Sequence, residues 1–414
     1  MPNLVRPFRL IQPPRHLAHL VASRSYISYE KEELKDKLIR NPYTYLQVIN
    51  PDTDQELDAK RGTKDYFREI RTVYDTFLQK GWLEGAGHAC YIIYRQTTPT
   101  HSFTGIVALL DLPKCEEGAL LTHELTLEKR EDLFSDYLET VGFHAEPILC
   151  ARPSNHPGET ELNRCISNLT NANEADCDFS TTDSIRHSIW YVNPELETTL
   201  SQALGPLDKL YLADGHHRLA SSIKLRHRHP NEPGVDRILA YILPAKEMSI
   251  LGYHRQVSDF KGDLDELIVK IEGLDSVTNV TEISTNESRV QKPGCIDIIN
   301  SGKSYRVCIQ EDKTGIRTDA GWLGEHVLKN CLGISDPRND PKLKYIPGNS
   351  DTSFSETSRD KIIFALHPTP INQIVAVADA GNTLPPKSTW VEPKLRSGLF
   401  IYEFGMHPHP TILH

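Results

Sequence analysis

The sequence predicts a mixed α/β protein. Stretches with the helical spacing of apolar residues alternate with short runs of branched and aromatic residues, which are typical of strands. The chain has 414 residues, of which 38% are hydrophobic and 25% charged, as in an ordinary globular protein. Because this length exceeds one average domain, we expect one large unit or two to three smaller ones.

The expected elements of the N-terminal half come first. Apolar spacing predicts helices over residues 30–41, 63–80, 123–141 and 217–226. Branched and aromatic runs predict strands over residues 88–94, 104–110, 147–151, 185–192 and 209–213. The polar stretch from Cys150 to about Asp183 is expected to be loop with some helix. We assign residues 1–236 to this α/β region.

The pattern changes after Arg237. Strands over 238–243 and 305–309, with a helix over 264–273, predict a smaller α/β unit at 237–319. Residues 320–414 form the third expected part, with a helix to Leu332, a turn-rich stretch at 334–341 and a strand at 362–366. We expect this C-terminal part to pack back near the functional site.

Charge and cysteine usage restrict the function classes. The net charge of −10 argues against a nucleic-acid-binding protein. No apolar run approaches the length of a membrane span, and the N-terminus lacks the apolar core of a signal peptide. The eight cysteines are scattered without a CxxC pair, so we expect reduced thiols and a cytoplasmic protein. The sequence does not specify the oligomeric state.

The most informative stretch is DKLYLADGHHRLASS at 208–222. A short apolar strand leads into Asp214 and Gly215, and a helix follows. The N–H groups and the positive dipole end of that helix favour an anion in the turn. His216, His217 and Arg218 add donors for phosphate, and Asp214 could hold a divalent cation shared with the phosphates. A purely structural interpretation, a turn followed by a capped helix end, remains the alternative.

A second candidate is the pair His123 and Glu124 in the string LLTHELT. Glu124 could accept a proton from a substrate hydroxyl, and His123 is expected to contact the substrate. The alternative is a carboxylate that complements a helix N-terminus.

The C-terminal third contains a cluster of cations on turn-rich segments. Arg338 lies between Asp336 and Asp340, and we expect it to contact the substrate. Lys387 and Arg396 are candidate phosphate ligands, because lysine offers a point charge and arginine a bidentate fork. The alternative is a network of surface ion pairs.

Several nucleotide-binding and catalytic motifs are absent from the sequence. It contains no Walker loop, no GxGxxG fingerprint after a strand, no kinase HRD or DFG set and no GxSxG elbow. If the protein transfers a phosphoryl group, its donor need not be ATP bound by one of these motifs.

Taken together, six strings resemble a widespread family long catalogued as a domain of unknown function. They span nearly the whole chain: VRPFRLIQP at 5–13, NPYTYLQVINPD at 41–52, HELT at 123–126, ADGHHR at 213–218, GISDPR at 333–338 and PPKSTWVEPKLRSGLF at 385–400. The GHHR turn also resembles the phosphate-binding turn of ParB-like proteins, a group that includes sulfiredoxin and free-serine kinases. One departure is that Ser25, Tyr26 and Ile27 stand where the family has a Pro-Tyr-Asp string.

The resemblance implies a ParB/sulfiredoxin-like catalytic core with additional α/β units. It also implies a pyrophosphate-dependent L-serine kinase that makes O-phospho-L-serine. By motif, Asp214 would hold Mg²⁺, His216, His217 and Arg218 would bind the donor phosphates, and Glu124 would be the base. We also expect a catalytic role for His217 and phosphate binding at Gly215.

Two other functions stay open at this stage. One keeps the site and uses ATP or ADP as the donor. The other is a ParB-like nucleotide-binding switch without turnover. Phosphorylation of serine in a panel of donors separates them.

Overall fold

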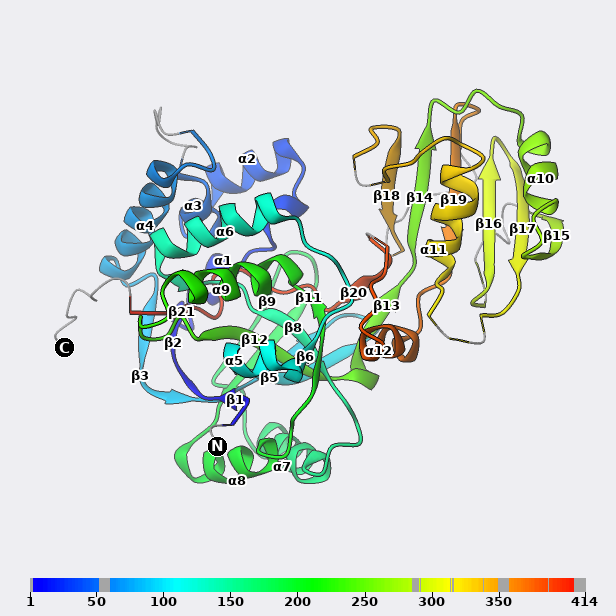
Figure 1. The fold of residues 1–414 in the computed structure, drawn as a ribbon. Helices are drawn as coiled ribbons and strands as arrows, with labels where there is room; N and C mark the ends of the chain where they lie inside the picture. Colours follow the sequence, from blue (N-terminus) through cyan, green and yellow to red (C-terminus); the bar gives the residue numbers. More distant parts are fainter. Residues whose placement is uncertain are drawn as a thin grey trace. The chain divides into compact units, whose positions relative to one another are not determined.

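The structure is a computed structural model that describes residues 3–51, 60–284, 290, 292–312, 314, 316–337, 339–348, 357–385 and 387–405. The chain forms two compact units. Unit 1 is Met1–Leu121, Thr126–Met248 and Pro393–His414, and unit 2 is Thr122–Leu125 and Ser249–Glu392. Both units combine helices with sheets, so the mixed α/β class is confirmed (Figure 1).

These units divide the chain differently from the three expected parts. Strand β12, Arg237–Pro244, pairs with β5 and β8 in the main sheet of unit 1, so the expected boundary at 237 cuts through that sheet. Strand β19, Lys361–Leu366, pairs with β16, Cys295–Asn300, within unit 2, so residues on either side of 320 share one sheet. Long-range strand pairing, which sequence spacing does not show, sets these limits.

Unit 1 is built on one large sheet whose strands run in the order β6-β11-β8-β12-β5-β4-β10-β9, with β1 pairing β5. The β11–β6 and β12–β8 pairs are parallel and the other pairs are antiparallel. Besides β12, the strands are β1 Val5–Arg6, β4 Ile92–Thr97, β5 Ser102–Asp111, β6 Leu120–Leu121, β8 Ile148–Arg152, β9 Cys177–Ser180, β10 Arg186–Tyr191 and β11 Leu210–Asp214.

Two small antiparallel pairs complete the strands of unit 1. They are β2 Phe8–Gln12 with β3 Glu84–Cys90, and β7 Phe143–His144 with β21 Tyr402–Glu403. The helices are α1 Ala18–Val21, η1 Tyr26–Ser28, α2 Lys31–Arg40, α3 Leu46–Ile49, α4 Lys64–Gln79, α5 Leu112–Lys114, η3 Cys115–Ala119, α6 Glu128–Val141, α7 Glu159–Ala172, α8 Pro194–Leu204, α9 His216–Arg228 and η4 Ala245–Glu247.

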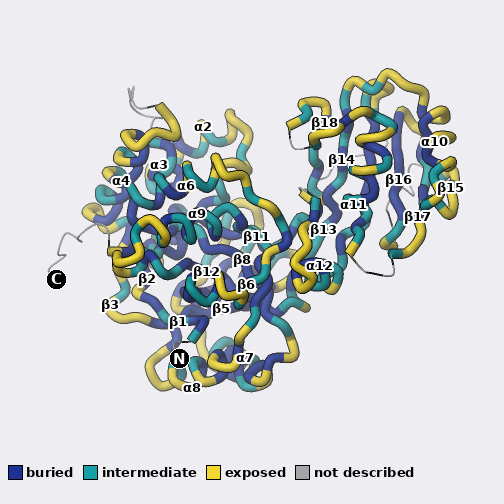
Figure 2. The backbone as a smooth tube through the Cα atoms, in the orientation of Figure 1, coloured by how far each residue is buried: buried dark blue, intermediate teal, exposed yellow. Residues whose placement is uncertain are grey.

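One hydrophobic core of unit 1 lies on one face of the large sheet, and a second includes Tyr74 and Phe77 of α4. Alternate residues such as Ile106, Ala108 and Leu110 are buried in the first core together with Leu162 of α7 and Leu204 of α8. The central strands are buried along their length, as Figure 2 shows. Helices α6 and α9 lie side by side (Figure 1). This packing fixes the end of β11 and the start of α9, where the candidate site lies.

One expected helix is shorter than the sequence predicts. The helix expected over 123–141 begins only at Glu128, and Leu127 has an extended backbone with φ −101° and ψ 120°. His123 and Glu124 therefore lie outside it, and the carbonyl of His123 accepts a hydrogen bond from the N–H of Leu384, 2.7 Å away. This pairing within unit 2 overrides the local helical pattern.

Unit 2 contains an antiparallel sheet in the order β15-β17-β16-β19-β14-β18. Its core surrounds the buried Trp322. Besides β16 and β19, the strands are β13 Ser249–Leu251, β14 Tyr253–Ser258, β15 Val277–Ile283, β17 Lys303–Ile309, β18 Leu343–Pro347 and β20 Trp390–Glu392, with β13 paired to β20. The helices are α10 Leu264–Glu272, α11 Asp319–Trp322, η6 Leu323–Lys329 and α12 Ile371–Asp379.

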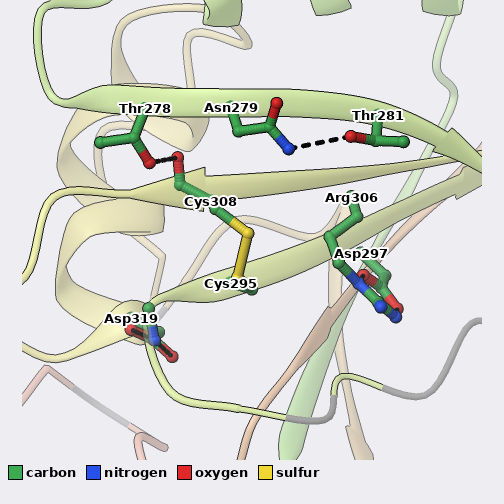
Figure 3. The surroundings of a disulfide bond; sticks show 9 residues. Thr278, Asn279, Thr281, Cys295, Asp297, Arg306, Cys308 and Asp319 are labelled. Atoms are coloured by element: carbon green, nitrogen blue, oxygen red, sulfur yellow. Dashed lines mark hydrogen bonds and ion pairs between the residues drawn. A yellow bond between two sulfur atoms is a disulfide. The ribbon is translucent and has the colours of Figure 1, made fainter.

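The expectation that all the cysteines are reduced thiols is wrong for one pair. Cys295 of β16 and Cys308 of β17 form a disulfide, with Cα atoms 4.2 Å apart (Figure 3). The two residues are 13 positions apart, and only the antiparallel register places them opposite each other. Six other cysteines are free thiols.

In the described part of the chain, no helix is long and apolar enough to cross a membrane.

Candidate functional site

The turn singled out in the sequence joins β11 to α9. Gly215 adopts a left-handed conformation, with φ 101° and ψ 26°, and its carbonyl accepts the N–H of Leu219 at 3.0 Å. As the N-cap of α9, glycine offers no side-chain acceptor to the first helical turn. The positive end of the α9 dipole therefore faces the Asp214–Gly215 turn. The cap residue has no side chain that could offset this positive charge.

Sterics at this turn also require glycine. A Cβ atom on Gly215 would lie 2.8 Å from Cγ2 of Ile148 and 3.0 Å from Nη2 of Arg218. Both distances are too short for ordinary van der Waals contact. The absence of a side chain at Gly215 lets the Arg218 guanidinium pack against the turn.

Arg218 lies between two carboxylates. Its Nη1 pairs with Oε1 of Glu146, and its Nη2 is 3.3 Å from Oδ2 of Asp214. Burial acts to lower the pKa of Arg218, but the charges of Glu146 and Asp214 raise it above its ordinary value. The guanidinium therefore stays a cation at the base of the turn.

The two histidines begin α9 in different environments. His216 is buried, and His217 is half-buried. Hydroxyl groups support the backbone of this first turn, because Oγ of Ser221 donates to the carbonyl of His217 at 2.6 Å and Oγ of Ser222 donates to that of Arg218 at 2.7 Å. Side chains of the second turn of α9 therefore form hydrogen bonds with carbonyl groups of its first turn.

Asp214 is the most accessible acidic group of the turn, with 45% of its side chain exposed. Among the described residues, no group of three or more histidine, cysteine, aspartate or glutamate side chains is arranged to hold a metal ion. Mg²⁺ in phosphotransferases is often held by one or two carboxylates together with substrate phosphates. A single exposed carboxylate beside a potential phosphate site fits that kind of binding.

The predicted base and its neighbour lie in the other unit. His123 is buried and Glu124 is half-buried, and both belong to the 122–125 segment of unit 2, whereas Asp214 to Arg218 belong to unit 1. Their proposed roles remain predictions.

The C-terminal candidates divide in the same way. Lys387 is exposed and belongs to unit 2, with a left-handed φ of 57°. Arg338 lies outside the described residues. Arg396 belongs to unit 1, where its side chain is only 4% exposed and its Nη2 is 2.7 Å from Oδ2 of Asp183. The structure therefore gives Arg396 a carboxylate partner inside the protein, and its role as a phosphate ligand stays a prediction.

Arg396 also influences a buried histidine. Nδ1 of His187 is 2.6 Å from the hydroxyl of Tyr94, and its Nε2 is 3.2 Å from Oγ1 of Thr181, which Arg396 also contacts at 3.3 Å. Burial, aided by the charge of Arg396, lowers the pKa of His187 to about 3. This imidazole stays neutral at physiological pH.

Glu146 and Ser397 are the residues that sequence reasoning missed. Glu146 follows β7 and contacts Arg218, which is 72 positions away, and Ser397, which is 251 positions away. Such separations leave no local spacing to detect. The one available signal was that Ser397 lies in the string PPKSTWVEPKLRSGLF, directly after Arg396.

A family model described as "Protein of unknown function (DUF1015)" matches residues 5–328, which include the Asp214–Arg218 turn. The chain belongs to this family. No curated protein matches this DUF1015 member.

Three solved structures are similar to this DUF1015 chain at low identity. SbnI with C-terminal truncation from Staphylococcus aureus is 15% identical, with a TM-score of 0.37 over 69% of this chain and 82% of that chain. A free serine kinase in complex with AMP is 14% identical, with a TM-score of 0.39 over 72% and 92%. A conserved hypothetical protein from Pyrococcus furiosus is 14% identical, with a TM-score of 0.35 over 71% and 95%. TM-scores in this range do not establish a shared fold.

Proposed function

We propose that this chain is a phosphotransferase that makes O-phospho-L-serine from free L-serine, with pyrophosphate as the phosphoryl donor and Mg²⁺ as the cofactor. The observation that carries the proposal is the β11–Gly215–α9 turn, which combines a left-handed glycine N-cap, an exposed carboxylate and a fixed arginine. The sequence resemblance to pyrophosphate-dependent serine kinases supplies the substrate class.

The turn has the groups that phosphoryl transfer requires. That reaction depends mainly on positioning and on neutralising charge on the phosphoryl oxygens. The N-terminus of α9 and the cation of Arg218 favour phosphate, and His216 and His217 begin the same helix. We assign donor binding to these groups together with Gly215.

Asp214 is the residue that would hold Mg²⁺, through an exposed carboxylate next to the phosphates. When bound, the ion would neutralise charge on the donor phosphates. Glu124 would accept the proton of the serine hydroxyl, whose oxygen forms the new P–O bond while the bond to the leaving phosphate breaks. Lys387, Arg396, His123 and Arg338 keep their proposed contacts with donor or substrate.

Phosphorus NMR of the purified full chain with Mg²⁺, L-serine and either pyrophosphate, ATP or ADP tests the proposal. Phosphoserine from pyrophosphate supports it, whereas phosphoserine from a nucleotide alone overturns the donor assignment. Nucleotide binding without any phosphoserine would favour the non-catalytic switch.

Asp214→Asn is the variant that links activity to the turn. Because it removes the carboxylate proposed to hold the metal, we expect the rate of phosphoserine formation to fall roughly a hundredfold. Asp178→Asn is the matched control, because Asp178 lies on β9 and pairs with Arg186 in the same unit. Full activity in Asp214→Asn would contradict the assigned site.

A further inference from the structure

A cavity of about 280 Å³ lies in unit 2, where β14 ends and β18 begins. Residues 257–263 and 331–334 line it, together with one face of α10, Asp340 and Lys342. The buried side chains of Leu267 and Ile334 give the cavity an apolar part. All of these residues belong to unit 2, and the kinase proposal uses none of them.

One wall of the cavity is fixed by backbone hydrogen bonds. The N–H of Ser258 donates to the carbonyl of Lys342 at 2.9 Å, and the N–H of Phe260 donates to the carbonyl of Asp360 at 2.9 Å. Between these two bonds, Asp259 has a left-handed backbone with φ 57°. That conformation costs free energy in a residue other than glycine, and it recurs where a site holds a side chain in place. The backbone therefore fixes the position of Asp259 in the wall.

The cavity is lined by charged groups that do not neutralise one another. Within the described part of the chain, none of its three lysines forms an ion pair: Lys261, Lys270 and Lys342. Glu266 lies four residues before Lys270 on α10, a spacing that commonly gives an ion pair, yet these two side chains do not form one. The ammonium groups therefore stay available to a ligand.

The carboxylates of the cavity fall into two pairs. Oδ1 of Asp263 accepts the N–H of Asp265 at 2.8 Å as the cap of α10, and Oδ1 of Asp340 accepts the N–H of Lys342 at 2.9 Å. The carboxylates of Asp259 and Glu266 have no such partner among the described residues. The lining thus offers three ammonium groups and two carboxylates to a ligand.

We propose that this cavity binds an acidic α-amino acid, a small molecule with two anionic groups and one ammonium group. Its anionic groups complement the lysines, and its ammonium group complements Asp259. A plain anion would gain the first attraction but would be repelled by the carboxylates. The cavity also suits a small molecule, because pockets for drug-sized ligands start at about 300 Å³. This inference is independent of the proposed function.

Cys331 is a reporter inside the cavity. It is half-buried, whereas the other free thiols of the chain are buried. Burial raises the pKa of the Cys331 thiol, and the positive charge of Lys270 acts against that rise, so the two groups lie near each other. Iodoacetamide should therefore alkylate Cys331 first in the native protein at mildly alkaline pH. Loss of that modification in Cys331→Ser identifies the site.

The rate of Cys331 alkylation in the full chain, read by mass spectrometry, tests the proposal with L-aspartate, O-phospho-L-serine and succinate as probes. Succinate is aspartate without its ammonium group, so it is the matched control ligand. We expect an acidic amino acid to protect Cys331 at a concentration roughly fivefold below that of succinate, the gain of one exposed ion pair. Comparison of aspartate with phosphoserine shows whether the second anionic group is a carboxylate or a phosphate.

Variants assign the two halves of the ligand. Asp259→Asn should remove the difference between aspartate and succinate, whereas Lys270→Gln should raise the half-protecting concentration of both roughly three- to fivefold. Lys344→Gln is the matched control, because Lys344 is an exposed residue of β18 outside the cavity. Each variant is compared with its own unprotected rate, since the charge of Lys270 also acts on the thiol.

Three results would overturn the proposal. They are no protection of wild-type Cys331 by either amino acid, equal protection by aspartate and succinate, and unchanged protection by aspartate in Lys270→Gln. Because alkylation requires no turnover, each result is read in the same way whether or not the protein makes phosphoserine.

Discussion

At the residue scale, the Asp214–Arg218 turn depends on one backbone conformation and one shared cation. Gly215 supplies the positive φ that other residues adopt at a cost. It also leaves room for Arg218, which two carboxylates keep charged. The chemistry of the turn therefore depends on the absence of a side chain at Gly215 as well as on the charges of Asp214 and Arg218.

Gly215→Ala tests this dependence. We expect a loss of about 1–3 kcal/mol in the free energy of unfolding, because strain at positive φ is joined by close contacts with Ile148 and Arg218. Gly81→Ala is the control, since Gly81 has φ 66° but nothing within 4 Å of its Cβ position. Its cost should be only about 1 kcal/mol. Equal losses in urea denaturation would show that the contacts at Gly215 contribute nothing.

At the scale of elements, the β16–β17 hairpin shows how register creates a bond. Ser301 and Gly302 form its two-residue connection with φ values of 47° and 84°, the positive-φ pair typical of tight hairpins. That connection fixes the register, which sets Cys295 opposite Cys308 and Asp297 opposite Arg306. The disulfide and the Asp297–Arg306 ion pair are both consequences of this turn.

Cys308→Ser tests the contribution of the disulfide to unit 2. Removing a cross-link over a loop of this size is expected to cost about 3 kcal/mol of stability, mainly by freeing the unfolded chain. Denaturation followed by tryptophan fluorescence measures it, with Trp322 as the buried reporter in this unit. Cys331→Ser, which changes a free thiol in unit 2, is the control. Eight reactive thiols in the unreduced, denatured protein would contradict the disulfide.

At the scale of the whole molecule, each unit contains a histidine whose pKa is lowered, the buried His144 in unit 1 and the half-buried His254 in unit 2. In unit 1, burial and the charge of Arg218 lower the pKa of His144 to about 3. Burial and the charge of Arg396 likewise lower the pKa of His187 to about 3. In unit 2, burial and the charge of Arg255 lower the pKa of His254 to about 4. The folded chain therefore takes up protons at these sites less readily than the unfolded chain.

This difference predicts that acid destabilises both units. Because the folded pKa values are lowered, the stability is present above the unfolded histidine pKa of about 6.5 and is lost as pH falls from there towards the folded values. Each of these histidines contributes up to about 1.4 kcal/mol per pH unit in that window. Urea denaturation across this range measures the slope.

His144→Phe identifies the source of that slope. The ring of His144 packs against Tyr402 and Phe404, so phenylalanine keeps the contacts and removes the titration. The slope for unit 1 should fall, and His88→Phe, at an exposed position, is the matched control. An unchanged slope in His144→Phe would exclude this histidine as a source of acid sensitivity.

The sequence by itself determined the mixed α/β class and the strand–turn–helix arrangement around Asp214 and Gly215. It also placed helices α2 and α4 within one residue of their observed ends, because local spacing and turn chemistry encode these features. Only the tertiary structure decided the division into two units, the start of helix α6 after His123 and Glu124, and the Cys295–Cys308 bond. It also decided that Glu146 contacts both Arg218 and Ser397 and that Arg396 is buried against Asp183. These contacts join residues far apart in the chain, and their free energy comes from pairing and burial that no local pattern records.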